Sequence, residues 1–286
     1  MIYTGHEADT QAIDFYDISE ALVGFQRSLA LTTHLALTGE VITQAPYLRG
    51  ARIFALPPEE GSWKITAAVV MGIYTAGTAP KDTPVGHLVS SLYDYAVSQT
   101  LGFHVDYNKT LGQQIEETKQ SRKEGKAITE AKVDALIEKI ETPIRQMHRP
   151  LIASETAEAA AIKTRLGGPP RQSQAVLTRE TYDYVSYTKR TEIPLMLLGR
   201  VSSYNVNTFK GRLFVFDEAR PIPFVLADNV RDPRTVGLIT WSLDANARDK
   251  LSGIGDLSCT AFIDYSRTGV MKRLVIVGLS KAGQLT

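Results

Sequence analysis

Residues 191–286 show five strand-like runs and one helix-like run in an order that few folds can accommodate. In chain order, three strands, the helix and two strands occupy 194–206, 211–216, 222–227, 232–250, 256–266 and 270–279. Asp232 can cap the helix, and Pro233 suits its first position. The order β-β-β-α-β-β predicts a five-stranded OB-like barrel with its helix between the third and fourth strands. An SH3-like barrel and an open sheet packed on one helix are the alternatives.

Local features of these strands favour a closed barrel. Gly199 lies early in the long first strand, as expected where a strand must bend to pair at both ends of a barrel. Pro221 and Pro223 enter the third strand, where proline suits a strand start or an edge. Cys259 lies within the fourth strand and is the single cysteine of the chain. We expect it to be a buried core thiol rather than a nucleophile.

Residues 1–150 mix helix and strand signals, which predicts a mixed α/β domain. The first helix is expected at 18–38, where Asp17 and Glu20 have the spacing of a capping box and Gly39 is the stop. The further elements expected are a hairpin of strands at 49–56 and 62–70, a helix at 83–102, and an αα-hairpin at 110–148.

Residues 151–190 are expected to form a connector of helix and loop. The alanine-rich run at 154–168 favours a helix, and Thr178 can cap a second, shorter one. The charged segment that ends at Pro194 marks a domain boundary near residue 190. The chain is thus expected to be an α+β protein, with a mixed α/β domain and helical hairpin followed by the OB-like barrel.

The net charge of +1 conceals an asymmetry between the two halves of the chain. Residues 1–144 hold 12 Lys+Arg against 18 Asp+Glu, whereas residues 145–286 hold 20 against 13. Charges of −6 and +7 favour head-to-tail self-association or an anionic partner for the second half, and two solvated surfaces are the alternative. The single cysteine, the absence of a targeting segment and an apolar run at 67–79 too short to span a bilayer predict a cytoplasmic protein.

An OB-like barrel would bind its ligand through the face of its second and third strands and through the 1–2 and 4–5 loops. Aromatic rings for stacking and cations for phosphates occur in these loops, as single-stranded nucleic acid requires. We expect them to cluster at one end of the barrel and to bind nucleic acid or a partner protein. The residues are Tyr204, Phe209, Lys210, Arg212, Tyr265, Arg267, Lys272 and Arg273.

The sequence contains no P-loop, no GxGxxG motif after a strand, and no GxSxG, HExxH or CxxC motif. No cofactor is therefore expected. His104 and Asp106 would share one face of a strand, and His6 and Glu7 could complete a divalent-metal site with them. A surface or hydrogen-bonded role for these histidines is the alternative.

Three stretches, GRVSSYNVNTFKGRLFVF with RPIPF, GFHVDYNKTLGQQ and PPEEGSWKI, resemble those of a bacterial family with no assigned activity. The resemblance implies an α/β N-terminal domain followed by a five-stranded β-barrel. It transfers no catalytic residue.

These observations favour a non-enzymatic binding or assembly subunit whose barrel acts on a protein or nucleic-acid partner. The N-terminal domain and its helical hairpin would then mediate self-association, and a bacterial antiviral or stress-response system would suit such a protein. The alternatives are a metal-dependent hydrolase using the four residues above and association with a membrane surface through 67–79, although no membrane partner is expected.

Overall fold

The computed structural model divides the chain into two compact units, Met1–Ser186 and Tyr187–Thr286. The residues that it describes are 1–42, 48, 50–56, 64–71, 84–103, 105, 107, 111–112, 115, 127–166, 169–248, 253–266 and 269–283. The mixed α/β architecture of the first unit and the barrel of the second confirm the predicted fold class.

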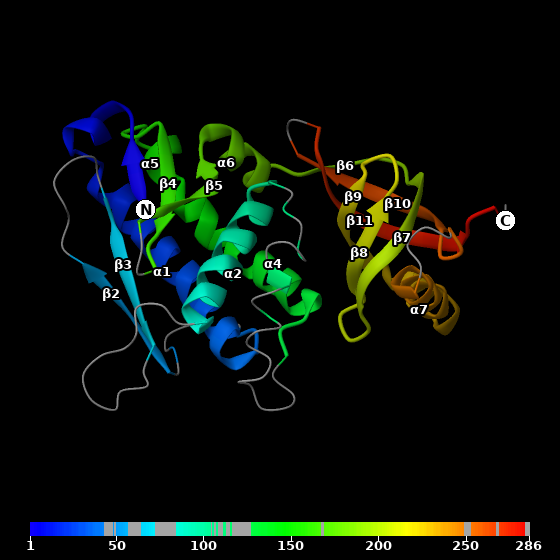
Figure 1. The fold of residues 1–286 in the computed structure, drawn as a ribbon. Helices are drawn as coiled ribbons and strands as arrows, with labels where there is room; N and C mark the ends of the chain where they lie inside the picture. The colour runs from blue at the N-terminus through cyan, green and yellow to red at the C-terminus, as the bar shows by residue number, and fades with distance from the viewer. Residues whose placement is uncertain are drawn as a thin grey trace. The chain divides into compact units, whose positions relative to one another are not determined.

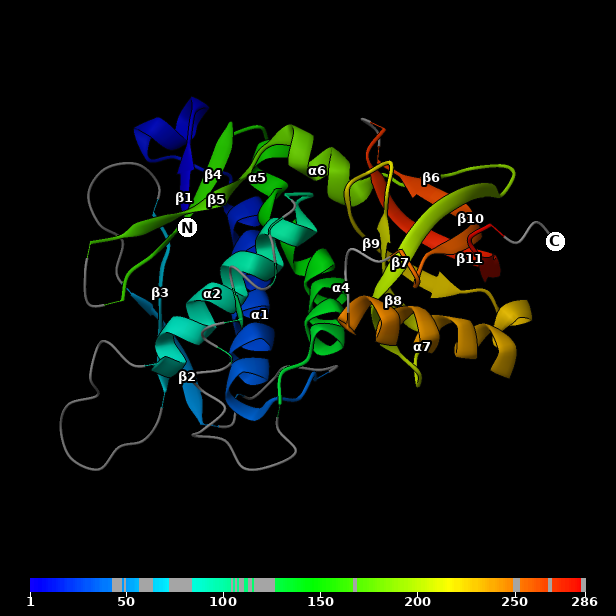
Figure 2. The ribbon, with the colours of Figure 1, turned by 45° about the vertical axis from the view of Figure 1, so that its right-hand side comes forward.

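The first unit packs the helices α1, α2 and α4 side by side, with a small sheet beside them (Figures 1 and 2). The sheet has the antiparallel order β1-β4-β5, and β2 and β3 form a separate hairpin. In chain order the described elements are β1 (Ile2–Thr4), η1 (His6–Thr10), α1 (Phe15–Thr38), β2 (Ala51–Leu56), β3 (Thr66–Met71), α2 (Pro84–Thr100), α4 (Glu130–Met147), α5 (Arg149–Ile152), β4 (Ala159–Thr164), β5 (Arg171–Leu177) and α6 (Arg179–Ser186).

Helix α1 begins three residues before its predicted start. Its N-cap is Asp14, whose carboxylate accepts a hydrogen bond from the backbone N–H of Asp17 at 2.9 Å. Asp17 is buried instead, and its carboxylate accepts bonds from the Nε of Arg149 at 2.8 Å and the N–H of Ser154 at 2.9 Å. Gly39 ends the helix in the left-handed conformation, as predicted.

The alanine-rich run expected as a helix is strand β4, so that prediction is wrong. Ala160 and Ile162 are buried on alternate positions, and β4 lies between β1 and β5. Pairing with two neighbouring strands outweighs the intrinsic helix preference of alanine. The predicted β2–β3 hairpin, α2 and the second helix of the αα-hairpin, α4, are confirmed, whereas 116–126 lies outside the described residues.

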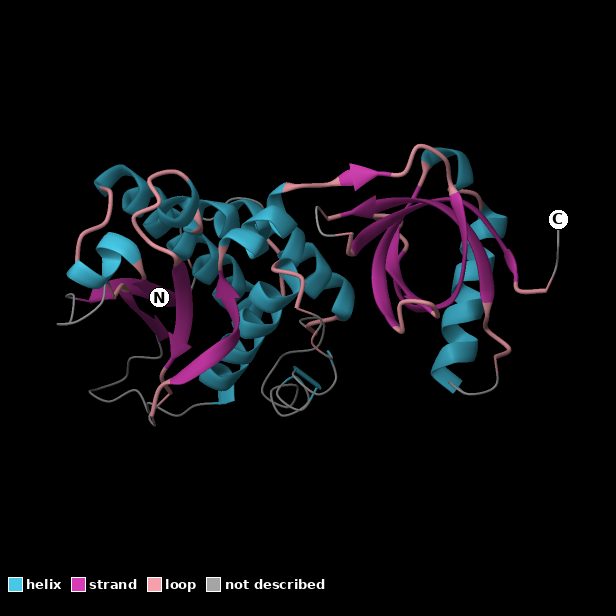
Figure 3. Ribbon diagram, turned by 90° about the horizontal axis from the view of Figure 1, so that it is seen from above, coloured by secondary structure: helices cyan, strands magenta, loops and turns pink. Residues whose placement is uncertain are grey.

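The second unit is a closed barrel in the predicted β-β-β-α-β-β order. Its strands pair as β7-β8-β9-β11-β10, and β10 also pairs with β7, which closes the ring (Figure 3). The elements are β6 (Lys189–Arg190), β7 (Leu195–Asn205), β8 (Lys210–Val215), β9 (Arg220–Leu226), η3 (Asp228–Val230), α7 (Pro233–Arg248), β10 (Leu257–Tyr265) and β11 (Met271–Lys281).

Gly199 is the point at which β7 changes partners, which confirms its predicted role. It pairs with Leu257 of β10 on one side and with Val215 of β8 on the other. A Cβ atom at this position would lie 2.4 Å from the carbonyl oxygen of Phe214, so the bend requires glycine. Pro221 and Pro223 precede the β9–β11 pairing, which begins at Phe224, and thus occupy an edge as predicted.

Within the described parts of the chain, no helix is long and apolar enough to cross a membrane. Most of the apolar run at 67–79 lies outside these parts. Its described portion, Ala67–Met71, belongs to β3 and pairs with β2.

Candidate functional site

The two loops that are predicted to bind the ligand lie at opposite ends of β8 and β9. Lys210 pairs with Val225 at one end, and Val215 pairs with Arg220 at the other, about 17 Å away along the strand. The Nη2 of Arg220 donates to the carbonyl of Met271 at 2.7 Å. Since β11 runs parallel to β9, the β10–β11 loop lies at the Arg220 end. The two loops are therefore separated along these strands, and the binding role of their residues stays a prediction.

At the Lys210 end, two of the predicted residues pack against the barrel core. The ring of Tyr204 stacks on the buried Phe224, with centroids 6.2 Å apart and planes at 14°. The ring of Phe209 packs against the same core and lies under the guanidinium of Arg231 at 5.0 Å. We call these four residues, Tyr204, Phe209, Phe224 and Arg231, the aromatic end.

A β-bulge between Val201 and Ser203 determines where Tyr204 points. Beyond the bulge Tyr204 pairs with Gly211, which in turn pairs with Phe224, so all three lie on the interior face. A Cβ atom on Gly211 would lie 2.8 Å from the Phe224 ring. Desolvation raises the pKa of Tyr204, although the charge of Arg231 opposes it.

The positive charge of the aromatic end is already engaged. The Nη1 of Arg231 lies 2.8 Å from the Asp228 carboxylate, and its Nε donates to the carbonyl of Leu226 at 3.1 Å. Lys210 is exposed beside it, while Arg212 on the same strand is buried. This end therefore offers aromatic surface rather than a concentration of cations.

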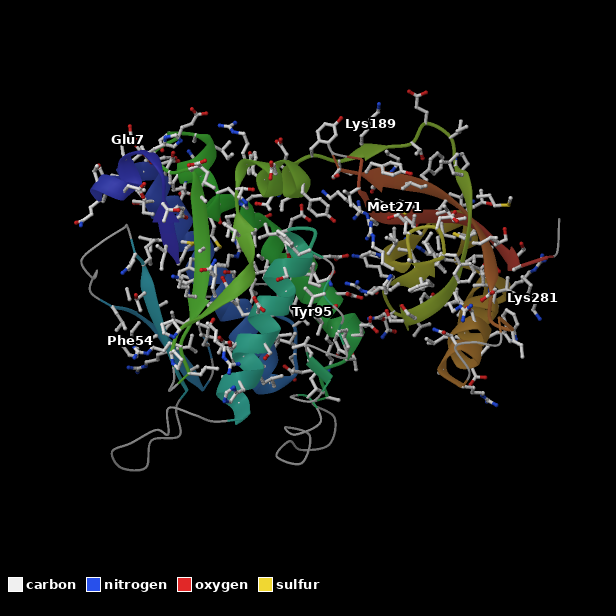
Figure 4. The ribbon with its side chains drawn as sticks, turned by 45° about the horizontal axis from the view of Figure 1, so that its top comes forward. Glu7, Phe54, Tyr95, Lys189, Met271 and Lys281 are labelled. Atoms are coloured by element: carbon white, nitrogen blue, oxygen red, sulfur yellow. The ribbon has the colours of Figure 1, made fainter. Side chains whose placement is uncertain are left out.

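Several cations lie where β6 and β11 flank β10, and two of them share one carboxylate. Arg190 of β6 and Arg273 of β11 both pair with Asp264 of β10, so the three side chains form a row across adjacent strands. Lys189 precedes Arg190, and Lys272 precedes Arg273; Figure 4 labels Lys189 on β6. We call Lys189, Arg190, Lys272 and Arg273 the basic cluster.

Asp264 organises this cluster. Its carboxylate accepts bonds from the Nε and Nη2 of Arg190 at 2.7 and 3.1 Å, and from the Nε and Nη2 of Arg273 at 3.1 and 2.9 Å. Burial raises the pKa of Asp264, but the hydrogen bonds from both arginines outweigh it and leave that pKa below its ordinary value. The carboxylate is therefore ionised at neutral pH and holds both guanidinium groups in place.

The basic cluster includes two cations that the sequence does not reveal, Lys189 and Arg190. They lie on a two-residue strand, too short to show any periodicity. The segment is nevertheless fixed to the barrel: the N–H of Thr191 donates to the carbonyl of Ile263 at 3.0 Å, and the Nζ of Lys272 donates to the carbonyl of Tyr187 at 3.1 Å. Of the other predicted residues, Tyr265 packs against the core, and Arg267 lies outside the described residues.

The structure describes only two of the four residues of the alternative metal site. His6 and Glu7 are exposed on η1, and Figure 4 labels Glu7 there, whereas His104 and Asp106 lie outside the described residues. In the remainder of the chain that the structure covers, no three His, Cys, Asp or Glu side chains are placed to hold a metal ion. The hydrolase hypothesis stays a prediction.

A different part of the barrel exposes apolar side chains. Ile193, Met196 and Leu198 expose 67%, 70% and 47% of their surface. Met196 and Leu198 are alternate residues of β7 and thus share a face. We call these three residues the apolar row, and exposed apolar patches are typical of protein–protein contacts.

Two family models match the chain. Residues 1–186 match the domain of unknown function DUF7946, and residues 194–280 match the family of unknown function DUF7947. No curated protein and no solved structure matches the chain.

Proposed function

We propose that this chain, which belongs to the DUF7946 family, is a non-enzymatic binding protein whose barrel takes single-stranded nucleic acid along β8 and β9. The observation that carries the proposal is the basic cluster on β6 and β11, the second of which pairs with β9. The unit that contains it, residues 187–286, holds 14 Lys+Arg against 9 Asp+Glu, a net charge of +5. Phosphate groups are attracted by such an excess of positive charge.

The basic cluster and the aromatic end supply different chemistry. The basic cluster provides cations for the phosphate backbone, and the partly buried ring of Phe209 at the aromatic end provides an aromatic group for contact with a base. The two lie within reach of a strand of a few nucleotides, because Arg273 precedes Leu274, which pairs with Phe224 of the aromatic end.

Fluorescence anisotropy tests this proposal. It measures the binding of the full chain to a labelled 20-mer of deoxythymidine and to a labelled 20-mer of uridine. If three or four phosphates are contacted, affinity should fall about 20- to 50-fold between about 50 and 200 mM salt, because counterions are released on binding. Failure to bind either oligonucleotide at the lower salt concentration would overturn the proposal.

A second candidate function is assembly with another copy of this chain through the apolar row. The first unit holds 18 Lys+Arg against 22 Asp+Glu, a net charge of −4 that complements the +5 of the barrel unit. Complementary charge favours a head-to-tail contact between copies. Light scattering after size exclusion should then show an oligomer that Met196→Ser reduces to monomer, and a monomeric parent chain would exclude this function.

A further inference from the structure

We propose that Arg190 and Arg273 form a phosphate-binding subsite to which the segment before the barrel contributes as much as the barrel itself. The inference rests on the proposed function and adds to it the residues that bind the backbone of the nucleic acid. One of them, Arg190, lies on the two-residue strand β6, outside the strands and loops by which an OB-like barrel is expected to bind.

The hydrogen-bonding capacity of the two arginines supports the subsite. A guanidinium group has five N–H donors, and each arginine directs its Nε and Nη2 toward Asp264. Three N–H groups of each arginine are not used by that carboxylate. The side chains are 50% and 48% exposed, so these donors can be reached from solvent.

The number of arginines per carboxylate at Asp264 differs from that at three other arginines of the barrel. Arg200, Arg231 and Arg248 each lie against one carboxylate, on Asp256, Asp228 and Asp244 respectively, which balances their charge. At Asp264 two arginines share one carboxylate, which is itself only 1% exposed. A net positive charge is therefore left on the accessible side of this row.

The geometry suits phosphate in particular. A guanidinium fork matches two oxygens of a phosphate, and it remains charged at every physiological pH. Both forks are already fixed by Asp264, so they lose little conformational freedom when a ligand binds. A phosphodiester of a nucleic acid and an inorganic polyphosphate offer the same oxygens, so either is a suitable probe.

Arg190→Gln is the decisive variant, because it removes one guanidinium group while Arg273 still pairs with Asp264. Lys281→Gln is the matched control: it removes the same charge from the opposite end of β11, about 33 Å along the strand from Met271 (Figure 4). Arg190→Lys provides a second test, since it keeps the charge but removes the fork.

In the anisotropy assay, Arg190→Gln should weaken oligonucleotide binding about threefold to tenfold and lower the slope of log affinity against log salt by about 0.7, the loss of one phosphate contact. Arg190→Lys should weaken binding with little change in that slope, and Lys281→Gln should weaken binding by less than about twofold. Inorganic polyphosphate should displace the oligonucleotide from the parent chain.

Two results would overturn the subsite while the proposed function stands: a parent chain that binds while Arg190→Gln matches Lys281→Gln, or binding that polyphosphate does not compete. A parent chain that binds neither oligonucleotide overturns both proposals. Far-UV circular dichroism and thermal unfolding of each variant establish that any loss of binding occurs in a folded protein.

Discussion

The hydroxyl of Ser242 on α7 accepts a hydrogen bond from the backbone N–H of Val201 on β7 at 2.9 Å, and it donates one to the carbonyl of Gly255 at 2.6 Å. Val201 lies at the β-bulge, where the ladder leaves backbone groups without a strand partner. The amide of Asn246, one turn further along α7, donates to the carbonyl of Val201 at 3.1 Å. Helix α7 thus holds the barrel together at the irregularity that directs Tyr204 inward.

Ser242→Ala should lower the free energy of unfolding by about 3 kcal/mol, because it leaves a buried N–H and a buried carbonyl unpaired. Urea unfolding followed by circular dichroism measures the change. Thr240→Ala is the control on the same helix, since its exposed hydroxyl bonds to its own helix backbone, and its cost should be below about 0.5 kcal/mol. Equal effects of the two substitutions would contradict the role of Ser242.

Gly199→Ala and Gly237→Ala should change stability in opposite directions. A methyl group at Gly199 meets the carbonyl oxygen of Phe214 at 2.4 Å, so we expect a loss of about 2 kcal/mol or more. Gly237 is exposed on α7 with nothing within 4 Å of its Cβ position, so alanine should add about 0.5–1 kcal/mol through its helix propensity. Thermal unfolding of both variants and of the parent chain measures these changes in stability. A Gly199→Ala variant as stable as the parent would contradict the bend at this position.

The stability of the first unit should depend on the protonation of His148. The ring is buried, its Nδ1 donates to the carbonyl of Ile144 at 2.8 Å, and its Nε2 lies 2.9 Å from the hydroxyl of Thr181. Burial lowers the pKa of His148 from 6.5 to about 4, against the opposing effect of the Ile144 bond. The imidazole of His148 binds a proton more tightly in the unfolded chain than in the folded one. The neutral, buried ring therefore contributes fully to stability above about pH 6.5, and this contribution is lost as the pH falls through about 4.

This contribution amounts to about 3 kcal/mol. Urea unfolding at a series of pH values should therefore show a steeper decline between pH 6.5 and 4 for the parent chain than for His148→Gln. His6→Gln, which replaces an exposed histidine, serves as the control and should keep the profile of the parent. Parallel profiles for the parent and His148→Gln would rule out the effect.

Cys259 should be inert toward thiol reagents while the barrel is folded. Its side chain is fully buried in the barrel core, and burial raises the pKa of the thiol to about 12. Since only the thiolate reacts, a colorimetric disulfide reagent at pH 8 should modify the protein in urea but not in buffer. Modification within seconds in buffer alone would show that the barrel core is open, contrary to the structure.

Local sequence signals determined most of the elements and their order. Gly39 ends α1, and Asp232 caps α7 through bonds to the N–H and the hydroxyl of Thr235, both at 2.9 Å. The β-β-β-α-β-β order of the barrel and the bend at Gly199 could also be predicted. These features depend on caps, turns and periodicity, which act between residues a few positions apart.

What the tertiary structure decided depends on contacts between distant residues. Strict alternation along β7 would direct Tyr204 outward from the inward-facing Val201, and the bulge reverses it. The parallel pairing of β9 with β11 separates the two predicted ligand loops, and pairing with β1 and β5 makes the alanine-rich β4 a strand. The basic cluster exists only because β6 joins β10 beside Asp264, and no local pattern in two residues can specify a partner 74 positions away.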